Sequence, residues 1–304
     1  MDIPILLIVF NRPKETRELI NILREIKPKK IYVSADGPKF DNRFNKEISE
    51  TREVINEIDW DCTLLKRFNK ENLGCRVAVS LAIDWLFENE EYGIILEDDC
   101  MPSVSFFQFC QENLLRYRNN RNISIISGRN HLKDYCPINN SDYFFSTGSI
   151  WGWATWKDSW KMYSKAEEIW KDCSKVKNSL LWFKELSPKK YRQIIDGCQK
   201  EKLGKISSWA YIWSYARILN KTMGIIPRVN LVKNIGFSSS ATHTSNYEED
   251  ISSSELQFPL NHPKVVRFDK IDFSYSDRTA ETRIQFFFSK RILRRFRKIL
   301  FKYE

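Results

Sequence analysis

The chain has 304 residues, enough for one large domain or two smaller ones, and its 42% hydrophobic and 29% charged content is ordinary for a globular protein. This composition excludes a wholly disordered, collagen-like or polytopic membrane protein. Of the formal net charge of +10, residues 283–304 carry +7, because they hold eight Lys and Arg against one Glu. We therefore expect no nucleic-acid partner, since such a protein would be basic along its folded surface.

The seven cysteines are scattered, with no Cys-x-x-Cys pair and no His at zinc-finger spacing. This pattern predicts a reduced, cytoplasmic protein. The apolar run Ile3–Phe10 follows Asp2 and ends at Pro13. We expect no signal peptide, because the basic segment is missing and the run is too short. No apolar run reaches the ~20 residues that cross a bilayer.

The first hundred residues alternate short apolar strands with amphipathic helices. This alternation predicts an α/β fold with a doubly wound, mostly parallel sheet, whose ligands bind beyond the carboxyl ends of the strands. The expected strands are Ile3–Phe10 (central), Lys30–Ala35, Thr63–Arg67 and Tyr92–Leu96. The expected helices run from Pro13 to before Pro28, over Ile48–Ile58, and from Asn72–Gly74 with Val77, Leu81, Trp85 and Leu86 on its apolar face.

Three adjacent carboxylates, Glu97-Asp98-Asp99, directly follow a predicted buried strand. Like charges this close repel unless a cation offsets them. Mg²⁺ or Mn²⁺ would do so and would also bridge a substrate diphosphate, because both ions prefer oxygen ligands. The alternative is a solvated acidic turn.

Three further residues lie at the ends of neighbouring elements. Asp36 is placed either to accept a hydrogen bond from a base or ribose, or to form an ordinary Asp-Gly-Pro turn. Asn72 precedes the next helix and could face the same crevice. Arg76 is either a diphosphate contact or a solvated side chain.

Six segments in this order resemble nucleotide-sugar-dependent glycosyltransferases of the glycosyltransferase A fold, which is Rossmann-like. The likeness is to bacterial surface-polysaccharide enzymes and, in part, to inverting N-acetylglucosaminyltransferase I. The segments are PILLIVFNRP (4–13), SADGP (34–38), ENLGCRVA (71–78), ILEDDCMPSVSFFQF (95–109), GSIWGWATW (148–156) and NLVKNIGFSSSATHT (230–244).

The resemblance implies roles for individual residues. The donor-binding residues would be Phe10, Asn11, Arg12, Asp36, Asn72, Arg76, Glu97, Asp98 and Asp99. Glu97-Asp98-Asp99 stands at the family's DXD motif, so Asp99 would bind the metal directly. His243, in ATHT, would reach the ion or the diphosphate; otherwise it is structural.

Eight of the ten tryptophans lie between Trp151 and Trp213. By the same resemblance Trp151, Trp153 and Trp209 would border the acceptor pocket, because an indole face packs well on a pyranose; core packing is the alternative. The expected catalytic base is absent, since Ala210 stands where relatives carry an acidic residue. Either the chain is a substituted form, or Asp98 or another carboxylate serves, or turnover is weak.

The resemblance and the composition together divide the chain. Residues 1–110 would bind the nucleotide sugar, 111–245 would form the acceptor-binding half of the same domain, and 246–282 would be a loop or linker. In 283–304, Ile292, Phe296 and Ile299 recur at helical spacing among basic residues. This pattern predicts a basic amphipathic helix that holds the protein on the inner face of an anionic cell membrane; docking on its own domain or on a partner subunit is the alternative.

We therefore expect a metal-dependent, inverting glycosyltransferase. It would move a sugar from a nucleoside diphosphate sugar, UDP-sugars being favoured, to a hydroxyl of a lipid-linked or surface glycan such as lipopolysaccharide or capsule. A sugar-nucleotide pyrophosphorylase is one alternative, although Phe10-Asn11-Arg12-Pro13 contains no glycine where such enzymes carry a Gly-rich loop. A glycan-binding or membrane-docking protein with impaired catalysis is another, and Ala210 favours it. The loop Ser238–Glu255 is expected to close over the donor.

Overall fold

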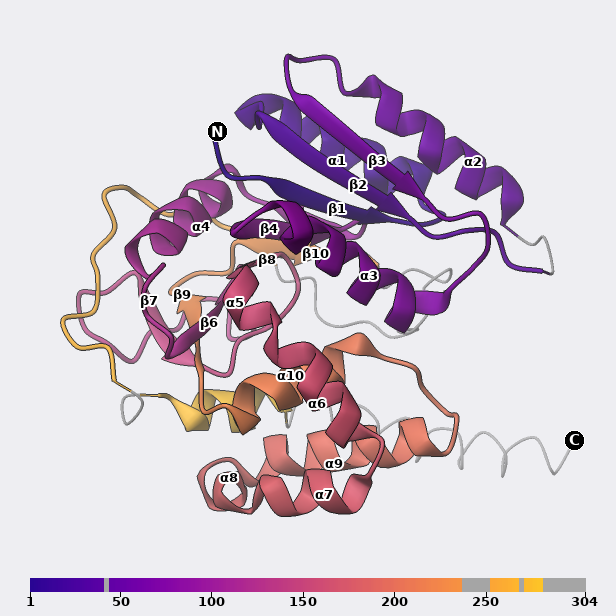
Figure 1. Cartoon of the computed structure of the whole chain (residues 1–304). Coiled ribbons are helices and arrows are strands. Elements are labelled where there is room, and N and C mark those ends of the chain that lie inside the picture. The colour runs from indigo at the N-terminus through magenta and orange to yellow at the C-terminus, as the bar shows by residue number, and fades with distance from the viewer. Residues whose placement is uncertain (41–43, 237–251, 268–270, 281–304) are drawn as a thin grey trace, which may run out of the picture.

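The computed structural model describes residues 1–40, 44–236, 252–267 and 271–280 (Figure 1). Across these residues eight strands form one mixed, mostly parallel sheet in the order β3-β2-β1-β4-β8-β6-β9-β7, and β10 pairs with β5 in a small antiparallel sheet. The strands are β1 (Ile5–Val9), β2 (Lys30–Ala35), β3 (Thr63–Phe68), β4 (Tyr92–Glu97), β5 (Cys100–Pro102), β6 (Ile123–Ser127), β7 (Tyr143–Ser146), β8 (Trp153–Trp156), β9 (Met223–Pro227) and β10 (Val232–Asn234).

Strand β1 lies at the centre of the parallel part, as predicted, between β2 and β4. Its apolar residues alternate between two cores: Ile5 and Leu7 pack on one face of the sheet and Leu6 on the other. A strand covered on both faces needs apolar side chains at successive positions, which explains the unbroken run of the sequence. The doubly wound α/β fold is confirmed.

Helices cover both faces of the sheet. Helices α1 and α4 contribute to the first core, and α3, α6, α7, α9 and α10 to the second, which contains most of the tryptophans. The helices are α1 (Pro13–Ile26), α2 (Asn45–Val54), α3 (Gly74–Asn89), α4 (Val104–Arg116), α5 (Lys157–Trp160), α6 (Met162–Trp170), α7 (Cys173–Ser179), α8 (Leu181–Leu186), α9 (Pro188–Lys202) and α10 (Trp209–Leu219), with a 3₁₀ turn at Ile55–Glu57. In the described part of the chain, none of these helices is both long and apolar enough to cross a membrane.

The described residues after 251 pack on the domain and do not stand apart from it. The Leu256 amide donates to Ser105 Oγ over 2.9 Å, and the Asp272 amide donates to the Phe145 carbonyl over 2.7 Å. Residues 273–280 are helical, and Tyr275 is buried against Phe144. The described parts of the segment 246–282, which was predicted to be a loop or linker, thus pack against the rest of the domain.

Candidate active site at the carboxyl edge of the sheet

The strand order reverses between β1 and β4. From β1 the chain passes outward to β2 and β3, and then returns to place β4 on the other side of β1. Such a switch point opens a crevice beyond the carboxyl ends of the two strands, where open α/β sheets bind their ligands. Phe10-Asn11-Arg12 follows β1 and Asp98-Asp99 follows β4, so these predicted donor residues meet here.

Arg12 joins the two strand ends. Its Nη1 donates to Asp98 Oδ1 over 2.6 Å and to Asp99 Oδ2 over 3.0 Å. The Phe10 amide donates to Asp98 Oδ2 over 3.0 Å, so both oxygens of this buried carboxylate are engaged. Asp98 therefore organises the crevice. Asp98 was one of the possible catalytic bases named from the sequence. These contacts leave it poorly placed to take a proton from an acceptor.

Burial and mutual repulsion govern the charges of the triplet. Burial, followed by the nearby carboxylates of Asp99 and Asp98, raises the pKa of Glu97 to about 8. Burial also raises the pKa of Asp98, while Arg12 opposes that shift, and the carboxylates in turn raise the pKa of Arg12 against its own burial. Among the described residues, Arg12 is the cation that contacts these crowded carboxyl groups, a setting that favours a second cation.

Asp99 is held from the opposite side by the segment of β10, which the sequence reasoning did not single out. Asn234 Nδ2 donates to Asp99 Oδ1 over 3.2 Å, and the Ile235 amide donates to the Asp99 carbonyl over 2.9 Å. A side chain at Gly236 would collide with the Asp99 carboxylate. The only sequence signal for this support was the order Asn-Ile-Gly within residues 230–244.

Asp36, at the end of β2, holds the start of α3. Its Oδ1 accepts from the Leu73 amide and its Oδ2 from the Gly74 amide, both over 3.0 Å. Asn69 Nδ2 also donates to Oδ1 over 3.2 Å. Asp36 therefore caps the N-terminus of α3, a role that was not predicted, and its Oδ1 also accepts from the Gly37 amide over 2.9 Å within the predicted Asp-Gly-Pro turn. Its half-buried carboxylate still lies at the crevice, where Oδ2 accepts one described bond.

Two other residues at the start of α3 border the crevice. Asn72 Nδ2 donates to the Gly37 carbonyl over 2.9 Å and so fixes the loop after β2. Cys75 was not singled out from the sequence. Burial, then the charges of Glu97, Asp36 and Asp99, raise the pKa of its thiol to about 12, which shows that these carboxyl groups gather around it.

The carboxyl groups of the crevice suit a hard divalent ion in their chemistry. Among the described residues no three His, Cys, Asp or Glu side chains form a ready-made metal cage. Mg²⁺ and similar ions are commonly held by one or two carboxylates, with phosphate and water completing the shell. Asp99 is half-buried and so more accessible than Asp98, and it would serve as such a single anchor if an ion replaced the contact of Arg12 to Oδ2 or of Asn234 to Oδ1. His243 lies outside the described residues.

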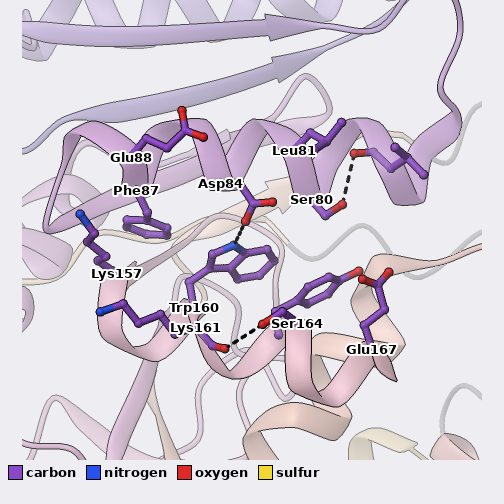
Figure 2. A pocket seen from close by; sticks show the side chains of 12 residues that line it. Ser80, Leu81, Asp84, Phe87, Glu88, Lys157, Trp160, Lys161, Ser164 and Glu167 are labelled. Atoms are coloured by element: carbon purple, nitrogen blue, oxygen red, sulfur yellow. Dashed lines mark hydrogen bonds between the residues drawn. The ribbon is translucent and has the colours of Figure 1, made fainter. Parts of the chain in front are cut away.

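Arg76 points away from the crevice. Its guanidinium pairs with Glu167 of α6 and Glu201 of α9, at 2.7 Å each. It therefore ties α3 to the helical layer, and the predicted diphosphate contact is not supported. Beside it, a groove of about 680 Å³ lies between α3 and α5–α6, where Trp160 Nε1 donates to Asp84 over 2.6 Å (Figure 2). This groove is separate from the strand ends.

The three tryptophans predicted to border the acceptor pocket differ in how far they are buried. Trp153 is 1% exposed and Trp209 is 2% exposed, and their rings stack with centroids 5.8 Å apart. Neither ring offers a face to a sugar, which argues against the predicted acceptor contacts and for the core alternative. Trp151 is half-buried at the edge of the sheet. Ala210 is the second residue of α10, next to Trp209 and half-buried.

No protein-family model and no curated protein matches the chain. Solved structures that resemble it include a mannosyltransferase from Pyrobaculum calidifontis in complex with GDP-Man and Mn²⁺ (12% identity, 54% of this chain and 47% of that chain, TM-score 0.34). Mouse xyloside xylosyltransferase 1 is 11% identical over 72% of this chain and 81% of its own, with a TM-score of 0.33. UDP-glucose pyrophosphorylase from Acinetobacter baumannii is 10% identical over 54% and 78%, with a TM-score of 0.34.

Proposed function

We propose that the chain is a glycosyltransferase that moves a sugar from a nucleoside diphosphate sugar to an acceptor hydroxyl, with inversion. The observation that carries the proposal is the crevice at the switch point. There Arg12 follows β1, Glu97-Asp98-Asp99 ends β4, and Asp36 ends β2, all at one edge of the sheet. The resemblance of the sequence to nucleotide-sugar-dependent glycosyltransferases is the reason for proposing sugar transfer at this crevice.

The residues of the crevice have distinct tasks in this reaction. Phe10, Asn11 and Asp36 would border the nucleoside, and Arg12 would place positive charge beside the diphosphate. Asp99 would hold Mn²⁺ or Mg²⁺, which when bound neutralises charge on the leaving diphosphate. Asp98 is fixed by Arg12 and the Phe10 amide. It would hold Asp99 and Arg12 in position around the diphosphate while the acceptor attacks the anomeric carbon in line.

The acceptor proposed is a hydroxyl of a lipid-linked or surface glycan at the cytoplasmic face of the cell membrane. The support is the sequence of residues 283–304, which lie outside the described residues and hold eight basic side chains among apolar ones. Basic and apolar residues together are the two signals that bind a protein to an anionic membrane surface.

A sugar-nucleotide pyrophosphorylase is the second candidate, because it uses related ligands. The exit of β1 disfavours it: Arg12 is engaged with two carboxylates, and α1 begins at once with Pro13, so no flexible glycine loop is available to surround a triphosphate. Product analysis separates the two activities. Release of a nucleoside diphosphate supports transfer, whereas release of pyrophosphate from a nucleoside triphosphate and a sugar 1-phosphate supports the second candidate.

A thermal-shift titration tests the proposal. UDP, GDP, CDP or dTDP with Mn²⁺, at about 100 times its Kd, should stabilise the protein by about 2.7 kcal/mol. The variant D99N should lose the Mn²⁺-dependent part of the shift, while D158N, on exposed α5, should keep it. The proposal is wrong if none of the four nucleotides shifts the melting temperature with or without the metal.

A further inference from the structure

A second group of polar side chains lies on the same edge of the sheet as the crevice, two strands away from β4. Both β4 and β6 are antiparallel to β8, so their carboxyl ends share one edge. Ile95 of β4 and Ser127 of β6 face the same residue, Trp153. Asp99 and His131 each lie four residues further on, beyond the ends of β4 and β6, and these two strands are two strand spacings, about 10 Å, apart.

The backbone that carries this group is closely fixed. The Gly128 amide donates to the Gly152 carbonyl over 2.7 Å, and a Cβ at Gly128 would collide with Val232 and Phe106. The His131 amide donates to Tyr275 Oη over 2.9 Å, and the Ser149 amide to Ser127 Oγ over 3.0 Å. The loops after β6 and before β8 are therefore held side by side.

The side chains of this group converge. His131 Nε2 lies 3.3 Å from Ser149 Oγ, and its ring centroid is 5.5 Å from that of Trp151. The buried Arg129 guanidinium lies 4.8 Å from the Trp151 ring centroid and donates to the Val232 carbonyl over 3.2 Å, which fixes the indole. His131, Ser149 and Trp151 are all half-buried, so each keeps some exposed surface.

Resting on the proposed function, we propose that His131 is the catalytic base and that Ser149 and Trp151 bind the acceptor sugar. Imidazole is the side chain whose usual pKa is suited to take a proton at neutral pH. The contact between His131 Nε2 and Ser149 Oγ is long for a hydrogen bond, at 3.3 Å, so an acceptor hydroxyl can take the place of Ser149 on Nε2. The Ser149 hydroxyl would then donate a hydrogen bond to the acceptor oxygen. The indole would pack on the apolar face of the pyranose.

The step balances without a further reactant. The acceptor O–H bond breaks and its proton moves to His131 Nε2. The acceptor oxygen forms the new bond to the anomeric carbon, and the bond from that carbon to the diphosphate oxygen breaks, with its electron pair leaving on the diphosphate. The ends of β4 and β6 lie two strand spacings apart, which leaves room for the sugar and the attacking hydroxyl between them.

Two variants test the base. H131Q keeps a polar side chain of similar size but cannot take a proton, and H262Q, at the histidine that contacts Glu112 of α4, is the matched control. With UDP-glucose, UDP-galactose or UDP-N-acetylglucosamine and octyl β-glucoside or octyl β-galactoside, we expect H131Q to lower the transfer kcat about 10²–10⁴-fold. The increase in melting temperature that UDP and Mn²⁺ produce should be the same in H131Q as in the parent protein. The control variant H262Q should retain transfer.

A direct binding measurement complements the kinetics. The chain has three histidines, so the imidazole signals of histidine-labelled protein can be assigned by substitution. Octyl β-glucoside should shift the His131 signals and leave those of His262 in place, and W151A should weaken this effect. Three outcomes would contradict the assignment of His131 as the base without affecting the proposed function. They are a transfer rate of H131Q within threefold of the parent, loss of the melting-temperature shift of H131Q with UDP, and His131 signals that octyl β-glucoside does not move. Failure of every nucleotide to bind the parent protein would overturn the proposed function as well.

Discussion

Arg12 contacts Asp98 and Asp99 with a single nitrogen, Nη1, at 2.6 and 3.0 Å. One guanidinium therefore joins the exit of β1 to the exit of β4, at the point where the strand order reverses. The side chains are largely buried, with Arg12 18% and Asp98 5% exposed, so solvent screens this pair weakly. The crevice is organised by the protein's own charges.

Removing this guanidinium should cost stability, because it leaves buried carboxylates without their cation. We expect R12A to lower the free energy of unfolding by about 3 kcal/mol in the presence of EDTA, measured by urea denaturation. R17A is the matched control. Arg17 lies in α1, the helix that directly follows Arg12, and pairs with Glu57 in an exposed position, so its loss should cost less than about 1 kcal/mol.

A divalent cation should compensate for the missing Arg12 charge. Mn²⁺ is expected to raise the melting temperature of R12A more than that of the parent protein, since the unpaired carboxylates would bind it more tightly. An equal Mn²⁺ effect on both proteins would mean that the ion does not bind at these carboxylates.

Glu97 should make the stability of the protein depend on pH. Its pKa is raised from 4.5 to about 8, so between these values the folded protein holds a proton that the unfolded chain has lost. The free energy of unfolding must therefore fall as the pH rises through this window. We expect E97Q to be stabilised relative to the parent, by about 3 °C or more in Tm at about pH 9 and by little at about pH 4, in EDTA. E53Q, on the exposed face of α2, should follow the parent at every pH.

Ala210 offers a test of whether a base is missing. An acidic residue at the second position of α10 favours the helix dipole, so A210D should fold normally. Because His131 is assigned as the base, we expect A210D to change the transfer rate by less than about threefold. A gain of about 10² or more would show that the parent chain lacks a base, and would contradict that assignment.

The basic segment 283–304 should be separable from catalysis. A chain ending at residue 282 is expected to lose binding to vesicles that contain anionic lipid, while transfer to soluble octyl glycosides is retained. Raising the salt concentration should weaken vesicle binding of the full chain only in part, since apolar insertion survives screening. Loss of transfer or unfolding of the shortened chain would show instead that this segment belongs to the catalytic unit.

The parallel half of the fold could be predicted closely from the sequence. Lys30–Ala35 forms β2 with the predicted bounds, and α1 ends at Ile26, before Pro28. These elements have strong local signals: β-branched apolar runs for strands covered on both faces, and prolines at helix boundaries. The clustering of Asp36, Arg12 and the acidic triplet followed from the same rule, because parallel strands end at one edge.

Other features depend on tertiary contacts that no local pattern specifies. Val77 and Leu81, predicted on the apolar face of α3, are 44% and 37% exposed, because Ala78 and Ala82 allow the close packing instead. Asp36 was recognised as a turn residue and accepts from the neighbouring Gly37 amide, but its two other backbone amide partners lie more than thirty residues away. Likewise, His131 and Ser149 meet only because β6 and β8 are neighbours, although neither belongs to a motif on its own.

Tyr275 Oη accepts from the His131 amide, and the Asp272 amide donates to the Phe145 carbonyl, so residues 271–280 connect the loop after β6 to strand β7. Both of these partners precede residue 150, which makes these distant parts of the described sequence interdependent. A shortened chain that stops before residue 272 should therefore loosen the loop that carries His131, and the loss would extend well beyond the segment removed.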